Sequence, residues 1–141
     1  STAKLKVLLL EGIHVGAVQR LEEAGFDVEL KGHALAGQEL VKQAQGYHAI
    51  GIRSKTQLTE GVLKQLEHLH VVGAFCIGTN QIDLQKANEL GVPAFNAPYS
   101  NTRSVAELVI GEMVALSRKL GDINSKAHQG EWKNQLRVLM N

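Results

Sequence analysis

The chain has 141 residues, of which 44% are hydrophobic and 21% are charged, and a formal net charge of +1. Such a chain can bury one core without a disulfide or a metal, and its balanced charge argues against a nucleic-acid partner. The single cysteine, Cys76, excludes an internal disulfide, and the apolar run 7–10 is too short for a signal peptide or a membrane span, so we expect a cytoplasmic protein without a membrane partner.

Short β-rich runs alternate with helical segments from the beginning of the chain. We predict a strand over 5–10 and a helix over 14–24, in which Val15, Val18 and Leu21 recur at helical spacing. Gly25 lies where a glycine commonly ends a helix. A strand over 26–30, a helix over 35–44 and a strand over 48–52 follow.

The alternation continues to about residue 95. Thr59 is a favourable N-cap for the next helix, before a fourth strand over 70–75. The inner face of this helix is apolar, with Val62, Leu63, Leu66 and Leu69. Asp83 caps a short helix that ends at Gly91, and the fifth strand spans 92–95. Because proline cannot donate to a strand ladder, Pro93 indicates that this strand lies near an edge of the sheet.

This order of elements predicts an α/β fold with a parallel five-stranded sheet and helices on both faces. Five strands favour the flavodoxin-like order. Beyond residue 95 the pattern changes. Ser104 and Glu107 form a capping box and begin a long helix predicted over 104–120, in which Gly111 and Ala115 leave room for another helix. A more polar helical piece over 122–134 follows.

Three loops follow strands at the sheet edge where open α/β sheets bind ligands, namely 51–60, 76–83 and 96–107. The first contains Arg53, Ser54 and Lys55, with no acid before Glu60. Arginine binds a carboxylate or a phosphate through two parallel hydrogen bonds, and lysine adds a point charge. We interpret this loop as an anion site, and the alternative is a solvated pair of cations.

The other two loops have ordinary explanations beside the functional ones. Backbone N–H groups near Gly78 can bind an anion, but a tight turn with Gly78 at positive φ would also explain the glycine. Thr79 and Asn80 can simply cap the next helix. The loop before Ser104 caps a helix, although a helix N-terminus also attracts anions.

Other candidate sites are weaker. We interpret the close pair His68 and His70 as structural rather than as metal ligands, and Cys76 has no base beside it that would make it a nucleophile. No Gly-x-Gly-x-x-Gly occurs in the 141 residues, so the dinucleotide-binding fingerprint is absent.

The segments GIRSKTQLTEGVL (51–63), GAFCIGTNQIDLQKANELGVPAFNAPYSNTRSVAELVIGEM (73–113) and KAHQGEWKN (126–134) closely resemble the NAD-dependent D-2-hydroxyacid dehydrogenases, and among them the phosphoglycerate dehydrogenases of bacterial type. The resemblance implies a flavodoxin-like substrate-binding segment over 1–100. Over 101–141 it implies a crossing helix and dimerisation arm that leads toward an NAD-binding domain. The implied partners are NAD, 3-phosphoglycerate or a related 2-hydroxy acid, and further copies of the chain bound through residues 104–134.

The resemblance also implies an activity and roles for individual residues. The activity is the oxidation of 3-phosphoglycerate to 3-phosphohydroxypyruvate, the first step of serine biosynthesis. Arg53, Ser54 and the backbone of Gly78 match positions that bind the substrate's carboxylate and phosphate. Lys55 stands where bacterial members have arginine. The positive charge is kept, but the pair of parallel hydrogen bonds that a guanidinium group can form is lost. Thr79 matches a residue that contacts NAD.

The family's catalytic residues and its dinucleotide-binding domain have no match in the 141 residues, and the tail 135–141 does not resemble the family. We therefore assign no catalytic residue, and we expect a fragment or truncated product that is inactive and binds NAD weakly by itself. The alternative is a stand-alone anion-binding or dimerisation module. A phosphate-accepting signalling domain is disfavoured, since Arg53 stands where such a domain has its aspartate.

Overall fold

Strands and helices alternate along the chain in the predicted order. The computed structural model describes residues 4–96, 110–111 and 114–115. Its elements are β1 (Lys6–Leu9), α1 (Val15–Glu23), β2 (Asp27–Leu30), α2 (Gly37–Ala44), β3 (Ala49–Ile52), α3 (Glu60–Lys64), β4 (Val71–Ala74), α4 (Leu84–Glu89) and β5 (Ala94–Asn96).

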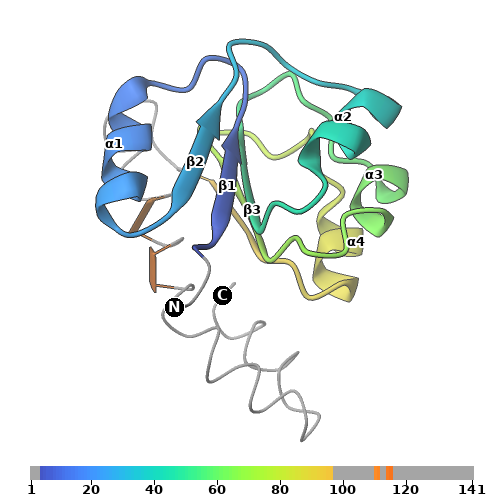
Figure 1. The fold of residues 1–141 in the computed structure, drawn as a ribbon. Helices are drawn as coiled ribbons and strands as arrows, with labels where there is room; N and C mark the ends of the chain where they lie inside the picture. Colours follow the sequence, from blue (N-terminus) through green and yellow to red (C-terminus); the bar gives the residue numbers. More distant parts are fainter. Residues whose placement is uncertain (1–3, 97–109, 112–113, 116–141) are drawn as a thin grey trace, which may run out of the picture.

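The five strands form one parallel sheet in the order β2-β1-β3-β4-β5, which confirms the predicted flavodoxin-like arrangement. Val7 of β1 lies opposite Val28 on one side and Ala49 on the other. β5 is an edge strand, as Pro93 indicated. Parallel strands end on the same side, so the loops that leave β1, β2 and β3 meet at the top of the view in Figure 1.

Helices cover both faces of the sheet. α1 lies on one face, and α2, α3 and α4 lie on the other (Figure 1). Successive strand residues point to opposite faces, so Leu8 packs in the core beneath α2, α3 and α4 while Leu9 packs in the core beneath α1. β3 and β4 are buried at every position, as expected of strands covered on both sides.

The predicted helix boundaries rest on side-chain caps that the structure confirms. The Thr59 hydroxyl accepts from the Val62 N–H at 3.3 Å, and the Asp83 carboxylate accepts from the Lys86 N–H at 2.9 Å. Gly25 has a φ of 98° after α1, a value that glycine adopts without strain. Within the described residues, no helix is long and apolar enough to cross a membrane.

α3 is shorter than predicted, because it ends at Lys64 rather than near Leu69. Beyond it the chain continues in tight turns, in which the N–H of Leu66 and that of Leu69 each donate to a carbonyl three residues earlier. Leu63, Leu66 and Leu69 recur at a spacing of three, which such turns satisfy as well as an α-helix does. All three remain buried.

The helix predicted over 104–120 lies mostly outside the described residues, as does the piece over 122–134. Positions 110, 111, 114 and 115 are helical. Ile110 is buried against the α1 side of the sheet and Val114 packs beside it, whereas Gly111 and Ala115 are exposed. The small residues of this segment therefore face away from the sheet.

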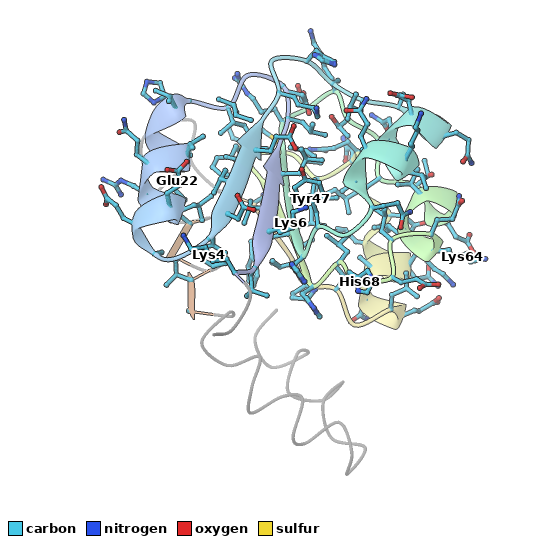
Figure 2. All side chains as sticks on the ribbon, in the orientation of Figure 1. Lys4, Lys6, Glu22, Tyr47, Lys64 and His68 are labelled. Atoms are coloured by element: carbon cyan, nitrogen blue, oxygen red, sulfur yellow. The ribbon has the colours of Figure 1, made fainter. Side chains whose placement is uncertain are left out.

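Three histidines gather at the amino ends of the strands. The Nδ1 atom of His48 accepts from the Lys6 N–H at 3.0 Å, so this nitrogen carries no proton. The His48 ring stacks on His70 with centroids 5.6 Å apart, and His68 approaches edge-on at 6.5 Å; Figure 2 shows His68 at the lower end of the unit. Burial, with the neighbouring cationic groups, lowers the pKa of His48 and of His70.

Candidate anion-binding site

A cavity of about 440 Å³ opens between the loops that follow β1, β2 and β3. Its lining comes from all three loops and comprises Glu11, Gly32, His33, Ala34, Arg53, Ser54 and Lys55. The sequence predicted anion-binding side chains at this edge of the sheet. The structure brings three of them, Arg53, Ser54 and Lys55, together around one opening. Their predicted binding of an anion stays a prediction.

The loop over residues 53–56, called the 53–56 loop below, is held by the carboxylate of Glu11. One oxygen, Oε2, accepts from the N–H of Arg53 at 2.7 Å and from that of Thr56 at 3.1 Å. The other, Oε1, accepts from the N–H of Lys55 at 2.9 Å. The carboxylate thus forms hydrogen bonds with the main chain of the loop and with none of the side chains of Arg53, Ser54 and Lys55.

Glu11 also has an unusual backbone conformation and an altered acidity. Its φ is 62°, in the left-handed region, where a residue other than glycine costs about 1 kcal/mol or more. Burial alone would raise the pKa of its carboxyl, but the three backbone donors outweigh burial and hold the pKa below its ordinary value. The Thr56 hydroxyl also lowers it, although this buried group makes no hydrogen bond of normal geometry. Glu11 therefore carries its negative charge at neutral pH.

Three of the four side chains of the 53–56 loop point outward, whereas Thr56 is buried. Arg53, Ser54 and Lys55 are exposed, and among the described residues neither cation forms an ion pair. A salt bridge within the protein would have neutralised much of their positive charge. Within the part of the chain that the structure describes, both cations and the Ser54 hydroxyl therefore line the cavity without an ionic partner.

Gln81 joins the 53–56 loop to the loop that follows β4. Its side-chain nitrogen donates to the carbonyl of Arg53 at 2.8 Å and to that of Gly78 at 3.2 Å, and the residue is buried. Just beyond the 53–56 loop, Leu58 pairs with Ile82 of the other loop in a short parallel bridge. The position of Gly78 relative to Arg53 is therefore fixed by a buried amide.

Gly78 and Thr79 do not line the cavity, although they lie on the neighbouring loop. The turn explanation for Gly78 is wrong, because its φ is not positive. A Cβ added there would meet nothing within 4 Å, so the space in front of this backbone is open. The helix-cap explanation for Thr79 and Asn80 is also wrong, since Asp83 caps α4. Thr79 is half-buried in the same loop.

Sequence reasoning missed Glu11 and Gln81. Glu11 directly follows the strand predicted over 5–10, and Gln81 lies within the predicted loop 76–83. A signal existed for Glu11, since an acid directly after the first strand of a parallel sheet lies close to the loop after the third. No residue pattern marked Gln81, whose role depends on burial. Among the described residues, no three His, Cys, Asp or Glu are placed to hold a metal ion.

Comparisons with known proteins show the family of the chain. The family model for the "D-isomer specific 2-hydroxyacid dehydrogenase, catalytic domain" matches residues 7–132. The chain is 46% identical over 132 residues to the D-3-phosphoglycerate dehydrogenase of Dictyostelium discoideum, and 50% identical over 130 residues to that of Escherichia coli strain K12. These alignments cover 94% and 92% of the chain but only 32% of each relative, so the chain spans about a third of their length.

Solved structures show the same fold. The TT0316 protein of Thermus thermophilus matches with a TM-score of 0.64 and 26% identity, over 91% of this chain and 42% of that one. The NAD⁺-bound 3-phosphoglycerate dehydrogenase of Entamoeba histolytica matches with a TM-score of 0.62 and 24% identity, over 79% of this chain and 38% of that one. Because this family model matches residues 7–132, which is most of the chain, the chain belongs to the D-isomer specific 2-hydroxyacid dehydrogenase family.

Proposed function

We propose that the chain forms the substrate-binding segment of an NAD-dependent D-3-phosphoglycerate dehydrogenase, which oxidises the 2-hydroxyl of 3-phosphoglycerate to the ketone of 3-phosphohydroxypyruvate. The names of relatives that are 46% and 50% identical support this substrate. The observation that carries the proposal is the pair of exposed cations, Arg53 and Lys55, on one cavity at the carboxyl edge of the sheet. The same relatives disfavour a stand-alone anion-binding or dimerisation module.

The substrate carries a carboxylate and a phosphate, and the cavity offers donors suited to both. The planar guanidinium of Arg53 can bind two oxygens of one anion, whereas Lys55 contributes a compact charge. Ser54 can donate its hydroxyl. On the neighbouring loop, outside the cavity lining, the backbone of Gly78 borders open space and can donate its N–H. These groups bind and orient the substrate, while the chemistry of oxidation depends on other parts of the enzyme.

NAD, when bound, supplies the acceptor for the hydride that leaves the substrate. The residues present offer little to hold it. None of the five strands is followed by Gly-x-Gly-x-x-Gly, the turn that places a pyrophosphate at a helix N-terminus. Thr79, on the loop after β4, is the residue that we propose contacts the cofactor. We therefore expect no NADH formation by the 141-residue chain supplied with 3-phosphoglycerate and NAD.

Two further properties belong to the proposal. We propose a homodimer built on residues 104–134, because Gly111 and Ala115 are exposed on a helix whose other side, at Ile110, packs on the sheet. We also propose a cytoplasmic setting, which suits the unpaired Cys76. The first segment, 1–100, and the arm, 101–141, remain the proposed division of the chain.

The test is Arg53→Ala in the complete enzyme that contains this chain. A charge-assisted contact of this kind contributes about 1.5–3 kcal/mol, so kcat/KM for 3-phosphoglycerate should fall roughly tenfold or more. Thermal stability should hardly change, because the side chain is exposed. Lys42→Ala removes an exposed cation from α2 and serves as the control. An unchanged kcat/KM in Arg53→Ala would return Arg53 to the role of a solvated loop residue.

A further inference from the structure

Glu11 is the residue through which the ends of β1, β2 and β3 meet. Its own N–H donates to the carbonyl of His33 at 3.1 Å, and the N–H of Gly12 donates to that of Lys31 at 3.1 Å. The Glu11 carboxylate bonds the 53–56 loop through three backbone N–H groups. One short segment thus fixes all three loops that line the cavity.

The charge of Glu11 raises a conflict with anion binding. A carboxylate in the lining of a cavity repels an anionic ligand and offsets part of the attraction from Arg53 and Lys55. On charge alone, its removal should therefore strengthen binding. Both of its oxygens are occupied by donors of the 53–56 loop, however, and its backbone lies in a region that only glycine adopts without strain. These contacts point to a role for the side chain that charge alone does not describe.

We propose that Glu11 is a positioning residue for anion binding by the 53–56 loop, an inference that rests on the function proposed above. Its carboxylate occupies the main-chain donors of Arg53, Lys55 and Thr56 and orders them before a ligand arrives. The side chains of Arg53, Ser54 and Lys55 are then presented to the cavity in one arrangement. A loop ordered in advance binds more tightly because less freedom is lost on binding.

Glu11→Gln separates positioning from charge, because the two effects predict opposite signs. Glutamine has the same shape but only one oxygen, so its amide group must face at least one backbone N–H that now donates to a carboxylate oxygen. Positioning predicts that the affinity of the 141-residue chain for 3-phosphoglycerate falls about tenfold or more. Charge alone predicts that it rises. The affinity is measured by calorimetric titration.

The matched control is Glu22→Gln, which removes one negative charge from the exposed surface of α1 (Figure 2), a helix that contributes no residue to the cavity lining. It should leave the affinity unchanged. Amide hydrogen exchange without ligand provides a second readout. In Glu11→Gln, the amides of Arg53 and Thr56 should lose protection, while that of Leu10, which donates to the Gly51 carbonyl, should keep it. Such a confined loss separates local positioning from a general loss of stability.

The outcomes are distinguishable. Weaker binding with a confined loss of amide protection supports the proposal, whereas unchanged or tighter binding overturns it. Preserved protection of the Arg53 and Thr56 amides in Glu11→Gln also overturns it, whatever the affinity. If the unaltered chain binds 3-phosphoglycerate no better than inorganic phosphate, the proposed function loses its substrate, and inorganic phosphate becomes the probe for the same comparison of Glu11→Gln with Glu22→Gln.

Discussion

The close packing around Gly51 predicts that even a methyl group at this position lowers the stability of the fold. Gly51 lies in β3, two residues before Arg53, and faces the core beneath α1. A Cβ at this position would lie 2.5 Å from Cδ2 of Leu9, 2.9 Å from Cε1 of Phe75 and 3.4 Å from Cδ1 of Ile13. The first two distances are shorter than any van der Waals contact allows, so Gly51→Ala must displace at least two neighbouring side chains.

The loss in the free energy of unfolding depends on how far these neighbouring side chains can move. All three contacts are with the far ends of side chains, which can move, so the lower part of the overpacking range of about 1–3 kcal/mol applies. For a chain of this size, 1 kcal/mol corresponds to roughly 3–5 °C in Tm. We therefore expect Gly51→Ala to unfold about 3–10 °C lower than the unaltered chain, as followed by circular dichroism during heating.

Gly61→Ala is the matched control, since it makes the same chemical change at an exposed helical position of α3. Its nearest neighbour would be the Thr59 hydroxyl at 3.9 Å, which is an ordinary contact. Alanine favours a helix over glycine by about 0.5–1 kcal/mol, so this variant should gain a few degrees. If Gly51→Ala keeps its Tm, or gains stability as Gly61→Ala does, the argument from packing is wrong.

Three other predictions concern the site, the assembly and pH. Gly78→Ala should leave Tm unchanged and weaken binding of 3-phosphoglycerate in calorimetry, because its methyl group enters the open space before the backbone; equal affinity would remove Gly78 from the site. Gly111→Leu should convert a homodimer into monomers in analytical ultracentrifugation, and a monomeric unaltered chain at tens of micromolar would contradict the dimer itself. Because the folded-state pKa of His48 is lowered, its contribution to stability is complete above its ordinary pKa of about 6.5, declines below it and is lost once the pH passes the folded value. Urea midpoints should therefore fall from pH 7.5 to pH 5, less steeply in His48→Gln, whereas an equal slope would exclude His48 as a cause.

The architecture could be predicted from sequence because local signals and the global fold agree. Short β-rich runs that alternate with helical segments marked the five strands, and Thr59 and Asp83 marked helix starts whose caps the structure contains. α3 was overestimated because a spacing of three between Leu63, Leu66 and Leu69 suits tight turns as well as a helix.

The site was predictable only for side chains that face solvent. Arg53 and Lys55 stood out because two cations follow an apolar strand. Glu11 and Gln81 act on main-chain atoms of residues far away in the sequence, and no local pattern reveals such contacts. Only the turn alternative for Gly78 was wrong: glycine often signals positive φ, whereas here the structure shows open space before an ordinary backbone.

The attachment of the 53–56 loop through its main chain has a consequence for redesign. Glu11 accepts from backbone N–H groups, and Gln81 donates to a backbone carbonyl. Neither contact therefore depends on the identity of the side chains in the loop. The residues at 53, 54 and 55 can therefore be exchanged without loss of the loop's anchorage. Under the proposed function, a small library at these three positions should shift substrate preference among 2-hydroxy acids of different charge while the scaffold beneath stays the same.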